Sequence, residues 1–350
     1  MSSVRVRLAL FFVSTLVACG PGSSDSMAVE KVDLTAIGQS QSIQSVGFAP
    51  DGAPLVSVRY GAGSGANAFA KYDTLRYSFE SKTWSVFGPS SRCLGLGPRD
   101  STLFCQIVPE SGSVVEQHVQ RMKEGGQLES LSDDPNLPVI LNADGEGNLY
   151  VHSDVGGSPS LSVKLRGAST LTPVIRDLPA ANGQVFVSQD GATRFYLLGG
   201  RGLYRSVTPT QFDLIIDLTT LENAPLTNLI PGVIATDGTF YFSRADKREL
   251  WRLSPGGNQL TLFTTVPHGT VLSNVMADRQ NRLYVQVRTT DGSTLERAGE
   301  IYEYRGGTDW RLRLRYAGAV SHPSIAPNGS AYLTTLQASG VITDLVRIGN

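Results

Sequence analysis

The sequence predicts an all-β fold, a seven-bladed β-propeller of four-stranded blades. Three observations predict it. Gly and Pro number 37 and 18 among 350 residues while charged residues make up only 17%, which favours many turns and few solvated helices. A unit of two β-prone segments around a turn recurs seven times. A second hairpin lies between successive units, so each period supplies four short strands.

Each unit has an apolar stretch, a turn rich in Asp, Asn and Gly, and a second apolar stretch. The turn residues taken as equivalent are Asp51, Arg99, Asp144, Asp190, Asp237, Asp278 and Asn328. Their spacings are 48, 45, 46, 47, 41 and 50, which suits four strands with their turns. Asp or Asn is expected to close an Asx-turn there, with positive φ at the following Gly. We interpret these residues as turn formers, not ligands.

The second hairpins and the chain ends complete the ring. The second hairpins are expected at 74–87, 116–131, 161–178, 202–218, 249–263 and 301–316. After the seventh unit only one further strand remains, at 341–348, so the last blade lacks a fourth strand. We expect 29–37 to supply it, since this pairing removes the open sheet edges. The propeller should then span 29–350 as one domain.

The N-terminus predicts export. Arg5 and Arg7 precede an apolar stretch at 8–18 that is too short to span a bilayer, as in a signal peptide. Residues 16–19, Leu-Val-Ala-Cys, resemble the bacterial lipobox. The resemblance implies a lipoprotein signal peptide at 1–18 and a lipid on Cys19. An ordinary signal peptide with an incidental Cys19 is the alternative.

A short polar segment separates this cysteine from the propeller. Residues 19–28 are rich in Gly and Ser, and we expect them to form a flexible tether to the lipid. Gly20 follows the cysteine, which by the sorting rule of enterobacterial lipoproteins implies the outer membrane. The expected location is therefore the cell envelope, on the periplasmic or the outer face.

Two cysteines remain once Cys19 is set aside. Cys93 and Cys105 flank a turn at 97–101, so they are expected to face each other across a hairpin. An even pair in an oxidising compartment predicts a structural disulfide. Two free buried thiols are the alternative.

Two of the seven units carry a longer motif. Residues 143–151 are Ala-Asp-Gly-Glu-Gly-Asn-Leu-Tyr-Val, and 277–278, Ala-Asp, are followed by Leu-Tyr-Val at 283–285. They resemble the NHL and SMP-30/gluconolactonase type of propeller repeat, A-D-x-x-G-N-L-Y-V. Such repeats serve many unrelated functions, so the resemblance implies a fold more than an activity.

Candidate binding residues lie in loops that enter the innermost strand or leave the second strand, near the axial channel. They are His268, Asn274, His322, Asp154 and Asp246. SMP-30-like lactonases, as a family, bind a divalent metal in this region with an acidic residue and Asn side chains. Here Asn136, Asn182, Asn228 and Asn274 recur every 46 residues.

The phase of these asparagines argues against a shared metal site. They lie 8, 8, 9 and 4 residues before their turn Asp, so Asn274 does not match the others. Nor is the family's acidic residue found at the start of the first inner strand, where 41–45 are Gln-Ser-Ile-Gln-Ser. We therefore predict no catalytic residue, no metal and no cofactor.

The composition and the absence of known motifs exclude several classes of partner and activity. The net charge is −1 and no run of Lys or Arg is present, so nucleic acid is not an expected partner. The motifs CxxC, HxxxH, HExxH, GxSxG and the P-loop are all absent from the sequence. We expect a monomeric, lipid-anchored module that binds a protein or glycan or acts as a scaffold. The alternative is a metal-dependent lactonase or related hydrolase.

Overall fold

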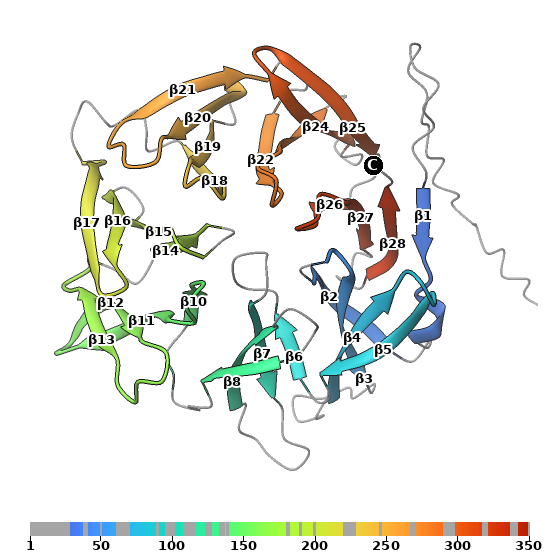
Figure 1. Cartoon of the computed structure of the whole chain (residues 1–350), viewed down its shortest axis with the longest axis horizontal. Helices are drawn as coiled ribbons and strands as arrows, with labels where there is room; N and C mark the ends of the chain where they lie inside the picture. The colour runs from blue at the N-terminus through green and yellow to red at the C-terminus, as the bar shows by residue number, and fades with distance from the viewer. Residues whose placement is uncertain are drawn as a thin grey trace, which may run out of the picture.

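The protein is a ring of seven four-stranded antiparallel sheets, seen down its axis in Figure 1. The predicted propeller is thus confirmed, and its blades follow chain order around the ring. The computed structural model describes residues 29–37, 41–49, 51–60, 71–88, 91–94, 102–107, 116–122, 128–132, 137, 140–179, 183–188, 191–198, 201–219, 229–244, 247–266, 271–289, 298–316, 321–336 and 342–348. Among these residues, no helix is both long enough and apolar enough to cross a membrane.

The first four blades take their strands from consecutive stretches of chain. Blade 1 contains β2 (Gln41–Phe48), β3 (Pro54–Tyr60), β4 (Lys71–Ser78) and β5 (Thr83–Gly88). Blade 2 contains β6 (Ser91–Leu94), β7 (Thr102–Ile107), β8 (Glu116–Met122) and β9 (Leu128–Ser132). Blade 3 contains β10 (Ile140–Ala143), β11 (Leu149–Val155), β12 (Ser158–Lys164) and β13 (Thr172–Ile175). Blade 4 contains β14 (Gln184–Val187), β15 (Arg194–Leu198), β16 (Gly202–Thr208) and β17 (Gln211–Asp217).

The last three blades lead back to the N-terminus. Blade 5 contains β18 (Ile230–Ile234), β19 (Phe240–Arg244), β20 (Glu249–Leu253) and β21 (Leu260–Thr265). Blade 6 contains β22 (Val271–Ala277), β23 (Leu283–Thr289), β24 (Ala298–Gly306) and β25 (Asp309–Tyr316). Blade 7 contains β26 (Ser321–Ile325), β27 (Ala331–Leu336), β28 (Ile342–Ile348) and β1 (Val29–Val32).

Two faces of the ring follow from this order. We call the strands of a blade A to D from the channel outward. The A–B and C–D connections meet at one face, here the AB face. The B–C and D–A connections meet at the opposite face, here the BC face.

The ring closes through β1, as the sequence predicts. Its residues pair antiparallel with β28, from Val29 opposite Ile348 to Val32 opposite Leu345. The strand is shorter than the predicted 29–37, because Asp33 turns the chain. Its carboxylate accepts hydrogen bonds from the Thr35 amide at 2.8 Å and the Thr35 hydroxyl at 2.6 Å, and η1 (Thr35–Ile37) follows.

An ordinary D strand ends in the same way. The sequence Asp-Leu-Thr recurs after β17, where the Asp217 carboxylate accepts from the amide and hydroxyl of Thr219 at 2.9 and 2.6 Å. The local sequence after β1 is therefore that of a D strand, although β1 comes from the other end of the chain.

The core lies between neighbouring sheets. Tyr150 and Leu161 of blade 3 pack with Val185 and Tyr196 of blade 4. Other junctions are filled in the same way, and Tyr150, Tyr196, Tyr284 and Tyr332 are fully buried in their B strands. Because both faces of a blade are buried, the strands carry apolar residues on both sides.

The A–B turns share one hydrogen-bond pattern in six blades. The carbonyl of the first turn residue accepts from the amide three residues later, at 2.8 to 3.0 Å. The first residues are Ala49, Asp144, Ser188, Ala235, Asp278 and Ala326. The residues with positive φ, three positions later, are Gly52, Gly147, Gly191, Gly238, Asn281 and Gly329.

This pattern corrects the predicted equivalence of the turn residues. Asp144 and Asp278 begin their turns, whereas Asp51, Asp237 and Asn328 occupy the third position. Those three do close Asx-turns, each accepting from the amide two residues on at 2.8 to 3.0 Å. After Asp144, however, positive φ falls on Gly147 and not on the adjacent glycine.

Candidate functional site

On the AB face, turns of neighbouring blades bind one another. The Gly145 amide donates to the Gly191 carbonyl at 3.0 Å, which joins blades 3 and 4. The Arg279 amide donates to the Pro327 carbonyl at 3.1 Å, which joins blades 6 and 7. Side chains bridge two further junctions, from Thr236 to Asn281 and from Asn328 to Asp51.

The turn glycines allow this close approach. A Cβ on Gly191 would lie 2.2 Å from the Gly145 Cα, and one on Gly52 would lie 2.1 Å from Asn328 Nδ2. Glycine is therefore required by its neighbour as well as by positive φ. Among the described A–B turns, hydrogen bonds thus join neighbouring blades at four junctions.

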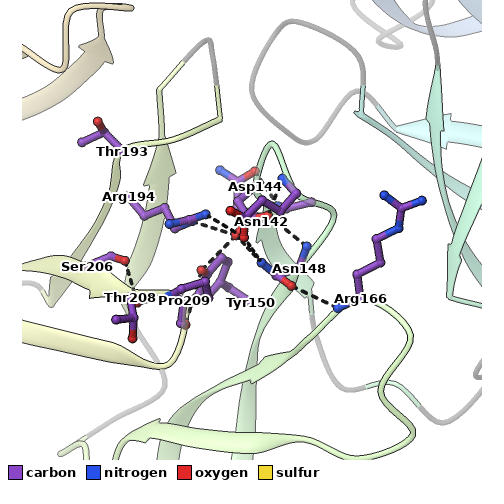
Figure 2. Close-up of polar contacts among 12 residues, drawn as sticks. Asn142, Asp144, Asn148, Tyr150, Arg166, Thr193, Arg194, Ser206, Thr208 and Pro209 are labelled. Carbon is purple, nitrogen blue, oxygen red and sulfur yellow. Dashed lines mark hydrogen bonds and ion pairs between the residues drawn. The ribbon is translucent and has the colours of Figure 1, made fainter.

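A buried carboxylate anchors the junction of blades 3 and 4, as Figure 2 shows. Asp144 Oδ1 accepts from the amides of Glu146 and Asn148, both at 2.9 Å. Asp144 Oδ2 accepts from the Tyr150 hydroxyl at 3.1 Å and from Arg194 Nε of the next blade at 2.7 Å. Burial and the adjacent carboxylate raise the pKa of Tyr150, so its hydroxyl stays a donor.

Blade 6 builds the same arrangement with a different cation. Asp278 Oδ1 accepts from the amides of Gln280 and Arg282, both at 2.9 Å. Asp278 Oδ2 accepts from Tyr284 at 3.2 Å and from Arg282 Nε at 2.5 Å. Arg282 stands where Asn148 stands in blade 3, so the cation comes from the same turn and not from the next blade.

These hydrogen-bond networks give the A-D-x-x-G-N-L-Y-V motif a structural role. The Asp fixes the turn, the Tyr caps the Asp, and an arginine balances its charge. Both carboxylate oxygens of Asp144 are occupied by donors from the protein, and the side chain is fully buried. The motif residues are structural, with no oxygen left for a substrate or metal.

Two candidate residues, Asp154 at the BC end of β11 and Asn274 in the middle of β22, accept hydrogen bonds from nearby backbone amides. The exposed Asp154 carboxylate accepts from the Gly157 amide at 2.8 Å, closing the β11–β12 hairpin. Asn274 Oδ1 accepts from the Val275 amide at 2.9 Å, at the register shift between Leu272 and Asn274. Asn274 is half-buried in the innermost strand of blade 6.

The structure does not bring these two candidates together. Asp154 belongs to blade 3 and Asn274 to blade 6, on well-separated parts of the ring (Figure 1). His322 lies on β26, with Thr334 as its register partner. His268 and Asp246 lie outside the described residues. In the part of the chain that the structure describes, no three His, Cys, Asp or Glu residues gather to hold a metal.

The cysteines are placed only in part. Cys93 on β6 and Cys105 on β7 are direct register partners, so the predicted pairing is compatible with the backbone. Cys19 and the tether 19–28 lie outside the described residues.

Sequence reasoning missed a second buried carboxylate in blade 6. Glu300 accepts from the Tyr302 hydroxyl at 2.6 Å and from Arg315 Nε at 2.7 Å. Glu300 and Arg315 are opposite each other in the β24–β25 register. An aligned hairpin would have revealed the pair, because opposite charges on facing strand positions attract.

The two faces of the ring differ most clearly in the length of the connections between their strands. The connections of eight or more residues between strands all join strand ends at the BC face: 33–40, 61–70, 108–115, 176–183, 218–229 and 290–297. The described A–B turns of the opposite face, in blades 1 and 3 to 7, are five or six residues long, and hydrogen bonds join them at four junctions. The BC face therefore carries the longer loops, and such loops commonly hold binding residues.

Comparison with known proteins supports the fold alone. No protein-family model and no curated protein sequence matches the chain. A solved structure from a study of two prolyl endopeptidases has a TM-score of 0.52 at 15% identity, over 87% of this chain and 46% of that one. Virginiamycin B lyase from Staphylococcus aureus with quinupristin gives 0.49 at 11% identity, over 93% and 99%. YCF48 bound to D1 peptide gives 0.47 at 12% identity, over 96% and 98%.

Proposed function

We propose that this protein is a lipid-anchored β-propeller of the cell envelope that binds a protein or glycan at its BC face. The observation that carries the proposal is the placement of its longest connections, all at that face. Loops held on a rigid scaffold are the usual place for binding residues. At the opposite face, polar groups of the described A–B turns join four pairs of neighbouring blades.

Anchoring rests on the lipobox-like residues 16–19 and on the Gly- and Ser-rich segment that follows. The test is the mass of the N-terminal peptide of the protein extracted from cells. We expect a peptide that begins at Cys19 and carries acyl chains. An unmodified peptide cleaved elsewhere would remove the anchor and leave the propeller as an exported module.

Partner binding is tested by photo-cross-linking in cells from two positions at opposite ends of the β10–β11 hairpin. A photoreactive amino acid replaces either Asp154, at the BC end of β11, or Glu146, at the AB end. Both positions are exposed. We expect one discrete adduct from position 154 and none from position 146. The same adduct from both positions, or from 146 alone, would contradict a BC-face site.

The lactonase alternative is tested by elemental analysis of the fragment that starts after Cys19. We expect no stoichiometric metal after incubation with calcium, manganese or zinc, because Asn274 already uses its amide oxygen on the Val275 amide. One bound ion per chain would instead favour the hydrolase, with His268, His322 and Asp246 as the first residues to substitute.

A further inference from the structure

The place where the chain enters the ring is fixed by strand register. Val29 pairs with Ile348, and Ile348 pairs with Ala331. Ala331 is the first residue of β27, directly after the A–B turn of blade 7. Val29 therefore lies level with the AB face, and β1 runs from that face toward the BC face. Figure 1 shows β1 outside β28, at the rim of the ring.

The segment before β1 is short compared with the height of a blade. Residues 20–28 separate Cys19 from Val29. A flexible Gly- and Ser-rich chain of this length has a root-mean-square reach of about 17 Å. The seven residues of β11 span about 23 Å from one face to the other. On average, a lipid on Cys19 is therefore expected to lie closer to the AB face than to the BC face.

The chemistry of the AB turns suits a polar boundary. Exposed residues of both signs stand there, among them Asp51, Glu146, Asp237 and Arg279. The large hydrophobic residues most exposed among the described positions lie on strands, outside the A–B turns: Val86, Val207, Leu214, Ile230 and Leu262. An apolar face that could enter the acyl region is thus not formed by these described turns.

We propose that the anchored protein stands with its AB face toward the lipid surface and its BC face away from it. This inference rests on the proposed lipid at Cys19 and adds the orientation that the anchor imposes. In this orientation the AB face contacts the headgroup layer of the membrane. The BC loops then face the aqueous side, where a protein or glycan can reach them.

The test compares two reporter positions in the full mature protein. Azidophenylalanine replaces Glu146 or Asp154, and each variant carries one donor fluorophore. The extracted lipoprotein is reconstituted into phosphatidylcholine and phosphatidylglycerol vesicles with acceptor-labelled lipids. We expect stronger energy transfer from position 146 than from position 154. Equal transfer, or stronger transfer from 154, would overturn the orientation.

A tether variant supplies the control. About thirty Gly and Ser residues inserted after Gly20 lengthen the reach of the chain, so the difference between the two positions should shrink toward zero. A difference that survives the insertion would show that contacts, not the tether, orient the protein. A mass without acyl chains at Cys19 would remove the anchor together with this orientation. Confirmed acylation with equal transfer would remove the orientation alone.

Discussion

Arg194 of blade 4 donates from Nε to the fully buried Asp144 carboxylate of blade 3, over 2.7 Å. The two residues stand on different sheets, and Arg194 is itself almost fully buried. The pair thus joins two blades through charge as well as through apolar packing. Removing one member of a buried ion pair leaves the other charge unbalanced.

We predict that Asp144→Ala lowers the free energy of unfolding by about 3–5 kcal/mol, because Arg194 and Tyr150 lose their shared acceptor. Asp237→Ala is the matched control. That carboxylate is exposed and accepts only from the Thr239 amide among the contacts seen for it, so about 1 kcal/mol is expected. Urea unfolding measures both. Equal losses would show that the buried network contributes nothing beyond the turn.

The second prediction separates backbone strain from crowding at two glycines. Gly191 and Gly156 have similar positive φ values, 74° and 67°. A Cβ at 191 meets Gly145 Cα at 2.2 Å, whereas a Cβ at 156 meets nothing within 4 Å. Gly156→Ala should cost about 1 kcal/mol and Gly191→Ala clearly more. If the two thermal midpoints fall equally, the contact between turns is not essential.

The third prediction concerns pH. Burial lowers the pKa of His152, whose Nε2 lies 3.4 Å from the Tyr196 hydroxyl. Below pH of about 6.5 the unfolded chain therefore binds more protons at this site than the folded protein. The stability contribution of neutral His152 is present above that pH and is lost as the pH falls through the folded pKa.

His152→Gln removes this dependence. The unfolding free energy of the parent relative to the variant should be greatest near pH 7.5 and should decrease toward pH 5. Titration of the His152 ring protons by NMR gives the folded pKa directly. A folded pKa at or above 6.5 would refute the assignment.

The fourth prediction is a disulfide between Cys93 and Cys105. Directly opposed residues of antiparallel strands have Cα atoms about 4.5–5.5 Å apart, within the range that disulfides accept. Peptide mapping without reductant should recover the two cysteines in one linked species. Reduction should lower stability by about 2–3 kcal/mol for a loop of this size. Full alkylation of both thiols in unreduced, denatured protein would disprove the bond.

Much of the fold was predictable because its determinants are local. Short apolar stretches separated by turns rich in Asp, Asn and Gly define hairpins within a few positions, and the strand count then required β1 to complete blade 7. The position that each Asp or Asn occupies within its A–B turn was not predictable. Asp144 points inward from the first position and Asp237 outward from the third, yet both stand in an Asp-Gly pair.

The candidate site was harder to predict for a related reason. The sequence places Asp154 and Asn274 near expected loops, but polar side chains close to turns and register shifts also accept hydrogen bonds from the backbone, as both do. The partnership of Asp144 with Arg194 depends on which sheets become neighbours. A pattern within one hairpin does not contain that information.

The seam between β1 and β28 also sets the order of events during synthesis. Of the described strands, β1 is made first, and its partner β28 (342–348) is made after all the others. Blades 1 to 6 contain only strands from consecutive stretches of the chain, so each can assemble as it emerges. Blade 7 must wait until β28 has been made. A premature stop anywhere before Ile342 leaves β1 without its partner, however complete the preceding six blades are.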